Sequence, residues 1–210
     1  MIAYKLLSQD LTSFRGSQWS IGKKQIVTEP GTKMCSDQVL HCYSHPLMAA
    51  MFNPIHANIA NPKLFKIETS EIINSDFSKL VCKEQTLLEE LPMPLLTAEQ
   101  RQEVAIRAAM TVTGASNLWI SWAEKWLSGE DRTIESESHA HAYSRAHAYP
   151  YDCNHAYSYA CARVYAHAYP YACAYACAHT YIYACAYAHS HILTQEQILN
   201  FLLATTKTTL

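Results

Sequence analysis

The sequence predicts an α+β protein. A small mixed sheet with a short helix comes first, followed by a pair of helices, an alanine- and tyrosine-rich tract and a closing C-terminal helix. Three observations lead to this prediction. Short apolar or β-branched runs bounded by turn residues fill the first half of the chain. Two threonine capping signals precede stretches with helical spacing, and a segment of strict two-residue alternation lies between them.

Residues 1–95 form the predicted α+β domain, in which short β-branched or apolar runs indicate strands. The expected strands are IAYKLL at 2–7, QIVT at 25–28, QVLHCYS at 38–44 and KLFKIET at 63–69. A short helix is expected over 45–52, where Pro46 is tolerated in the first turn. The segment LVCKEQTLLEELPMP closes the domain, and Pro92 and Pro94 mark its boundary.

A helical pair, packed on this domain, is expected over 96–132. Thr97 and Gln100 have the spacing of a capping box, which predicts a helix over 98–113. Gly114 stands where a left-handed residue would end that helix.

The second helix of the pair carries a tryptophan-rich stripe. Leu118, Trp122 and Trp126 recur at every fourth position, and Gly129 ends the pattern. Aromatic residues at helical spacing are more often core than a stacking platform, so we expect this stripe to be buried.

The closing segment, 193–210, also begins with a helix-capping pattern. Thr194 and Gln197 form a second capping box, and Leu193 and Ile198 have the spacing of a hydrophobic staple. We expect this helix to dock on the tract or on the N-terminal domain.

The tract at 133–192 is a low-complexity segment. From His139 to His191, every odd-numbered residue is His, Tyr, Cys or Arg, and the residues between them are mostly Ala. These four types share no side-chain property, but all have codons of the form pyrimidine-purine-pyrimidine. The simplest interpretation is an expanded DNA repeat translated in frame.

Two principles compete over the conformation of the tract. Alternation with period two favours a strand, whereas alanine is the best helix former and is depleted in strands. Pro150 and Pro170 would divide a helix into pieces near 139–149, 151–169 and 171–191. Because the alternation has a nucleotide-level cause, we expect helix rather than strand.

The tract is rich in metal-ligating residues, with eight histidines and five cysteines from 139 to 191. We nevertheless expect no specific metal site and no cofactor, since only Cys173 and Cys177 approach the spacing of a zinc motif. All cysteines are expected to be reduced. Surface imidazoles can bind nickel, copper or zinc adventitiously. The candidates are His139, His141, His189 and His191.

Charge and hydropathy exclude some partners. A net charge of -2 gives no basic surface for nucleic acid. We find no basic segment followed by a long apolar run, and no stretch of 18 apolar residues. We therefore expect a cytoplasmic protein with neither a nucleic-acid nor a membrane partner.

The motifs YK at 4–5, RG at 15–16 and LHC at 40–42 resemble an uncharacterised domain family of phages and bacteria. Its members open with a YK strand, an RG turn and a GFHxC-type strand before a short helix. Val39 stands in place of the usual glycine. Relatives also carry a helical segment like 122–132, followed by variable alanine-rich repeats, which supports a helical tract. The resemblance implies no activity.

Two functions fit these features. The first is a non-enzymatic structural or interaction protein that binds an unknown protein partner or associates with itself through the tract. The twelve tyrosines of the tract offer amphipathic contact area at a low cost in side-chain entropy.

The alternative is an ADP-ribosyltransferase-like enzyme or a nucleotide-binding domain in residues 1–95. The segment 39–52 resembles the strand-to-helix element of that class. The pocket candidates would be Tyr4, Arg15, His41 and Ser44. No catalytic glutamate motif follows, because the adjacent Glu89 and Glu90 are typical of a solvated surface. Fold likeness alone does not establish a function, so we favour the non-enzymatic interpretation.

The codon interpretation generates a prediction about metal. Replacing every His and Cys of 139–191 by Tyr or Ala should leave the fold intact and abolish metal retention. Thermal melting of the unsubstituted and substituted chains measures the stability of the fold, and metal analysis of both measures metal retention. Unfolding of the unsubstituted chain by a chelator would contradict the interpretation, because that is the behaviour of a protein built around structural zinc.

Overall fold

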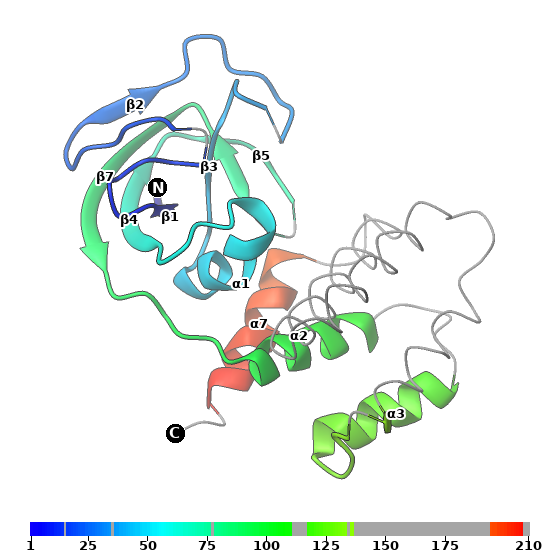
Figure 1. Ribbon diagram of the computed structural model, residues 1–210. Coiled ribbons are helices and arrows are strands. Elements are labelled where there is room, and N and C mark those ends of the chain that lie inside the picture. The colour runs from blue at the N-terminus through cyan, green and yellow to red at the C-terminus, as the bar shows by residue number, and fades with distance from the viewer. Residues whose placement is uncertain are drawn as a thin grey trace. The chain divides into compact units, whose positions relative to one another are not determined.

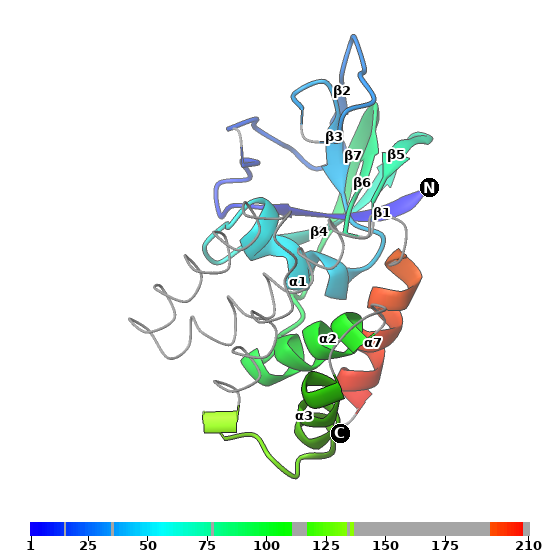
Figure 2. The same cartoon turned by 90° about the vertical axis from the view of Figure 1, so that its right-hand side faces the viewer.

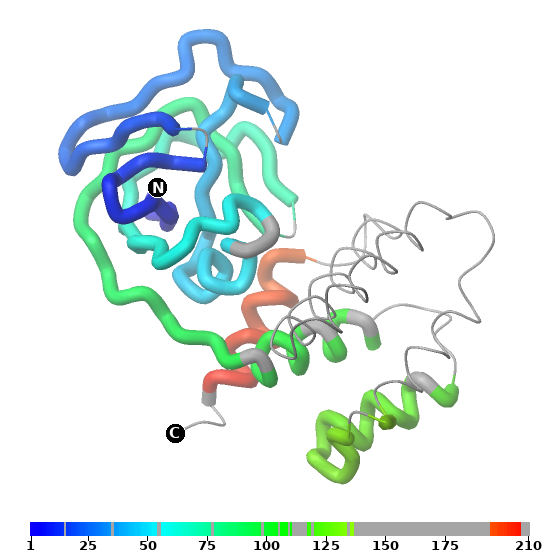
Figure 3. Tube along the Cα trace, viewed as in Figure 1, coloured from blue at the N-terminus to red at the C-terminus, as the bar shows by residue number. Residues whose placement is uncertain are grey.

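The computed structural model describes residues 1–14, 16–34, 36–76, 78–110, 117–133, 135–136 and 194–207, most of which are coloured in Figure 3. The chain divides into two units. Residues 1–96 and 194–200 make up the first, and residues 97–193 and 201–210 belong to the second.

The elements follow in the order shown in Figure 1, which confirms the α+β class. They are β1 (Ile2–Leu7), β2 (Lys24–Ile26), β3 (Leu40–Cys42), α1 (Pro46–His56), β4 (Lys63–Thr69), β5 (Ile72–Ser75), β6 (Leu80–Cys82), β7 (Glu84–Leu91), α2 (Ala98–Met110), α3 (Asn117–Ser128) and α7 (Gln195–Lys207).

The first unit contains two antiparallel sheets, with strand orders β1-β4-β7-β2 and β3-β6-β5. The sheets are connected at two places. Only Lys83 separates β6 from β7, so one length of chain runs from one sheet into the other (Figure 2). In addition, Tyr4 and Tyr43 exchange two backbone hydrogen bonds, with N···O distances of 2.9 and 2.8 Å. A parallel bridge joins Ile21 to Leu87.

The two sheets share one interior. Apolar residues from β1, β4 and β7 lie in the same buried cluster as residues from β3 and β6. The cluster contains Ala3, Leu7, Trp19, Cys42, Phe65, Ile67, Leu80, Cys82 and Leu87. Because alternate residues of a strand face the same side, Lys5 enters this interior between Ala3 and Leu7.

Helix α1 is longer than expected. It begins after His45, whose ring Nδ1 accepts a hydrogen bond from the Leu47 amide at 3.1 Å. The prediction of 45–52 stopped before Asn53 and Pro54, but the helix continues to His56. The buried Asn53 side chain then bonds both backbone groups of Ile59, at 3.0 and 3.1 Å, which fixes the chain as it leaves the helix.

Strands β1 and β4 have the predicted bounds, whereas β2 and β3 are shorter. Strands β5, β6 and β7 were not predicted individually. Glutamate is depleted in strands, and β7 contains Glu84, Glu89 and Glu90. The strand forms nonetheless because β7 pairs with β2 on one side and β4 on the other. Each of the three glutamates forms an ion pair with a lysine of a neighbouring strand.

Helix α2 of the second unit begins with the predicted capping box. The Thr97 amide donates to Gln100 Oε1 at 2.9 Å, and the Gln100 amide donates to Thr97 Oγ1 at 3.1 Å. Gly114 lies outside the described residues.

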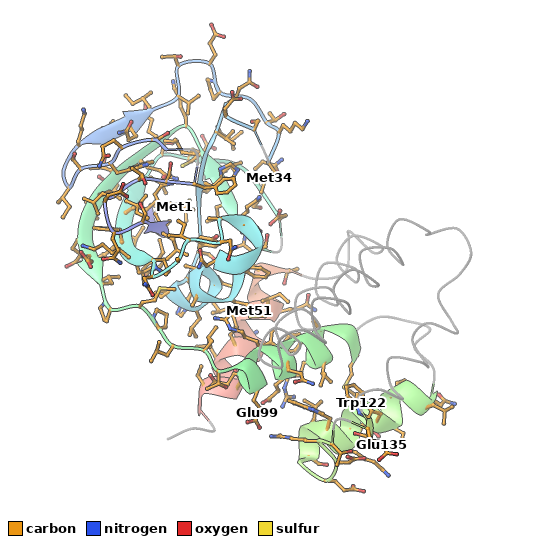
Figure 4. The ribbon with its side chains drawn as sticks, viewed as in Figure 1. Met1, Met34, Met51, Glu99, Trp122 and Glu135 are labelled. Carbon is orange, nitrogen blue, oxygen red and sulfur yellow. The ribbon has the colours of Figure 1, made fainter. Side chains whose placement is uncertain are left out.

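Helix α3 buries part of its tryptophan stripe. Trp126 and Ala123 form a buried cluster with Ile106 of α2, and Trp122, labelled in Figure 4, packs against that cluster. Leu118 is 58% exposed, so the stripe is not buried along its whole length. Gly129, at φ +80°, ends the helix as predicted.

Helix α7 begins with the second predicted capping box, in which Thr194 and Gln197 hydrogen bond reciprocally at 2.8 and 3.2 Å. Within the first unit, Gln195 Nε2 donates to the carbonyl oxygens of Asp76 (2.7 Å) and Lys79 (3.0 Å). The proposed staple residue Leu193 and the tract lie outside the described residues.

The Gln195 side chain therefore anchors the start of α7 to the turn at 76–79. We expect Gln195→Ala to lower the free energy of unfolding of the full chain by about 1–2 kcal/mol, since two hydrogen bonds are lost. Asn200→Ala, at an exposed position of the same helix, is the control and should change it little. Urea denaturation of both variants checks this, and equal stabilities would contradict the anchoring role.

Candidate functional site

Two groups of polar side chains lie within the first unit, and we name them here. The Lys5 cluster consists of Lys5, Trp19, Cys42, Cys82 and Gln85, in the interior between the sheets. The His56 relay is a hydrogen-bonded chain of side chains. Its members are Tyr43, His56, Ser78 and Asp76.

Lys5 is a buried cation with only 7% of its surface exposed. Its Nζ donates to the His41 carbonyl at 2.9 Å and lies 4.3 Å from the centre of a Trp19 ring. Burial lowers the pKa of Lys5 to about 8, and the negative charge available at Cys42 and Cys82 acts in the opposite direction. The charge of this lysine is thus stabilised by a carbonyl dipole, an aromatic face and two thiols.

Cys42 and Cys82 are free thiols, and neither is more than 1% exposed. Cys82 of β6 pairs with Leu40 of β3, so Cys42 lies two residues further along β3 on the same face. Cys82 Sγ donates to the carbonyl oxygens of Leu40 (3.6 Å) and Glu84 (3.4 Å). The neighbouring Cys42 thiol lowers the pKa of Cys82, although burial opposes the effect, and Cys82 raises the pKa of Cys42, which burial raises further.

Gln85 completes the Lys5 cluster from β7. Its Nε2 donates to Cys82 Sγ at 3.2 Å, within a fully buried environment. Gln85 Oε1 and Trp19 Nε1 are buried and form no hydrogen bond among the described residues. The interior therefore contains a donor and an acceptor that the surrounding fold does not satisfy.

The direction of each hydrogen bond in the His56 relay follows from Asp76. Its Oδ1 accepts from Ser78 Oγ (2.6 Å) and from the amides of Ser78 (2.8 Å) and Lys79 (2.9 Å). Because the Ser78 hydroxyl proton points to Asp76, Ser78 Oγ must accept from His56 Nε2, 3.2 Å away. His56 Nδ1 then accepts from the Tyr43 hydroxyl at 3.2 Å.

This direction decides what the relay can do chemically. A serine nucleophile must give its proton to the adjacent base, but the Ser78 proton is directed away from His56. The His56 ring also stacks with Tyr43 and with Phe52, at centroid distances of 5.9 and 5.5 Å. Burial raises the pKa of Tyr43, so its hydroxyl keeps its proton. The relay has the geometry of a structural network.

The candidates Tyr4, His41 and Ser44 all lie near the junction of β1 and β3 and are half-buried. Ser44 directly follows Tyr43, which pairs with Tyr4. The centre of the Tyr4 ring lies 6.3 Å from the centre of the His45 ring. The His41 ring instead hydrogen bonds to the Met34 carbonyl; Met34 is labelled in Figure 4. Arg15 lies outside the described residues.

Sequence reasoning missed Cys82 and Gln85 as site residues, as well as the roles of Lys5 and His56. One signal was available: Lys5 occupies an interior position of an otherwise apolar alternating strand. The pairing of Cys42 with Cys82 had no such signal, because it depends on the β3–β6 register.

The surface interpretation of Glu89 and Glu90 is confirmed. Both are exposed and form ion pairs across the sheet with Lys66 (3.0 Å) and Lys63 (3.2 Å). Exposed pairs of this kind contribute little to stability.

The tract candidates for adventitious metal, His139, His141, His189 and His191, lie outside the described residues. Within the part of the chain that the structure describes, no three His, Cys, Asp or Glu side chains are grouped so as to hold a metal ion. Among the same residues, no helix is long and apolar enough to cross a membrane.

Residues 1–99 match a family described as a domain of unknown function (DUF7666). The resemblance of the N-terminal segment to an uncharacterised domain is thereby confirmed in its general form. No curated protein and no solved structure matches the chain.

The cap of α1 generates a pH prediction. Burial lowers the pKa of His45 below its ordinary value of 6.5, so folding favours the neutral ring that accepts from Leu47. The stability that this cap contributes is present above pH 6.5 and is lost as the pH falls through the lowered pKa. His45→Ala should cost about 1 kcal/mol at pH 8.

His45→Asn is the matched control, because asparagine caps a helix but does not titrate. The free energy of unfolding of this variant at pH 8 should equal that of the unsubstituted chain. Below pH 6.5 its free energy of unfolding should decrease less than that of the unsubstituted chain. Urea denaturation from pH 5 to 8 measures all three proteins. The same pH dependence in all of them would contradict the role of His45.

Proposed function

We propose that the chain is a non-enzymatic structural or interaction protein of phage or bacterial type. Residues 1–99 would be its folded head, and the repeat-derived tract at 133–192 would be its interaction arm. The observation that carries this proposal is the direction of the His56 relay, in which the Ser78 proton points to Asp76 rather than to His56.

The Lys5 cluster supports the same proposal. A catalytic lysine or thiolate must reach a substrate, whereas Lys5, Cys42 and Cys82 are almost fully buried. Lys5 also contacts His41 and Trp19, and Cys82 accepts a hydrogen bond from Gln85. The polar chemistry of the head is therefore suited to holding the two sheets together.

The arm is proposed from its composition. Its twelve tyrosines can each contribute an apolar ring and a hydroxyl to a contact. Its partner would be a second copy of the chain or another protein.

An ADP-ribosyltransferase-like or nucleotide-binding activity is the second candidate. It is favoured by one observation, the gathering of Tyr4, Ser44 and His45 where β1 meets β3. A nucleotide bound there would place its rings against Tyr4.

One pair of measurements separates the candidates. Sedimentation velocity of the full chain should show association that increases with concentration, and this should disappear when the twelve tract tyrosines are replaced by serine. Titration with NAD should show no saturable binding to either chain.

Two results would contradict the proposal. One is a full chain that stays monomeric at every concentration. The other is saturable NAD binding that Tyr4→Ala abolishes, which would establish the second candidate instead. Ile2→Thr, an exposed β1 position 45% accessible to solvent, is the control for substitution in that strand.

A further inference from the structure

Cys42 and Cys82 lie on the same face of the paired strands β3 and β6, in one buried cluster of the first unit. We propose that Cys42 and Cys82 together bind one monovalent soft metal ion, of the copper(I) or silver(I) class, with Lys5 balancing the charge. Thiolate sulfur is the protein ligand that such ions prefer.

The β3–β6 register argues against a disulfide between the same residues. Cys42 and Cys82 are diagonal neighbours, since Leu40 is the residue directly opposite Cys82. Diagonal positions are typically about 7–8 Å apart, beyond the usual Cα separation for a disulfide. The strands thus place the two cysteines on one face as diagonal neighbours, without placing them for a disulfide bond.

The charge of the site selects the valence of the ion. Two thiolates carry two negative charges, and the Lys5 ammonium carries one positive charge. A monovalent ion makes this buried group neutral, whereas a divalent ion leaves one uncompensated positive charge, which is unfavourable in the interior. Lys5 is suited to this role because it interacts electrostatically with both thiols.

The number of available protein ligands, two sulfur atoms, also favours a monovalent soft ion. Structural zinc takes four ligands, and the described residues provide no third His, Cys, Asp or Glu beside the two sulfurs. An ion that accepts two sulfur ligands fits this pair.

Gln85 holds the Cys82 sulfur from the neighbouring strand β7, because its Nε2 donates to Cys82 Sγ at 3.2 Å. Binding would exchange two S–H protons for two bonds from sulfur to the metal, and both protons would pass to solvent. Donors to the sulfur atoms hold metal ligands in place.

The test uses the full chain with the other six cysteines replaced by serine. These are Cys35, Cys153, Cys161, Cys173, Cys177 and Cys185. Copper(I) is titrated under anaerobic, reducing conditions against a chelator that removes copper from histidine. We expect one ion per chain, and X-ray absorption should show two sulfur ligands and no nitrogen ligand.

Substitutions in the same background test each residue. Cys42→Ser and Cys82→Ser should each abolish retention of copper(I). Lys5→Met should weaken it by about 10- to 100-fold, the usual effect of removing a partner just outside the ligands. Lys79→Met is the control, because Lys79 is also buried but outside the cluster, and the affinity should not change.

Several results would overturn the proposal. Copper(I) could be retained after loss of either cysteine, or the chain could retain zinc(II) equally well. The X-ray absorption spectrum could show nitrogen or oxygen ligands, or the chelator could remove the copper(I). If thermal melting shows that a variant does not fold, the X-ray absorption spectrum of the intact site still shows whether the two sulfur atoms bind the copper(I).

Discussion

The buried ammonium group of Lys5 is the constraint around which the first unit is organised. An isolated charge in a protein interior is strongly unfavourable, so its surroundings must compensate for it. The compensation comes from separate segments: the His41 carbonyl of β3, the Trp19 ring before β2, and the thiols of β3 and β6. Because Lys5 belongs to the other sheet, these contacts connect the two sheets from inside, as the Tyr4–Tyr43 bridge connects them through the backbone.

The His56 relay has a similar effect at the end of α1. It joins the C-terminal residue of that helix to Tyr43, after β3, and to the turn at 76–79. The backbone of the same turn accepts hydrogen bonds from Gln195. Histidine, serine and aspartate side chains therefore connect elements far apart in the sequence.

The sequence predicted those elements whose signals are local. β1, β4 and both capping boxes follow from short patterns, and the structure confirms them. β7 was missed because glutamate is depleted in strands, and the pairing of β7 with β2 and β4 overrides that local preference. The Lys5 cluster was missed for a related reason: the proximity of Cys42 to Cys82 is set by strand register, which no local pattern in either segment specifies.

The organisation of the first unit depends on Lys5 being a buried cation whose surroundings hold the two sheets together. Nuclear magnetic resonance of the Lys5 side chain, labelled with nitrogen-15 and carbon-13, can follow its titration in the full chain. We expect Lys5 to titrate with a pKa of about 8, well below the ordinary value of 10.5. A Lys5 pKa equal to that of the exposed lysines would contradict it, because such a lysine would be in contact with water.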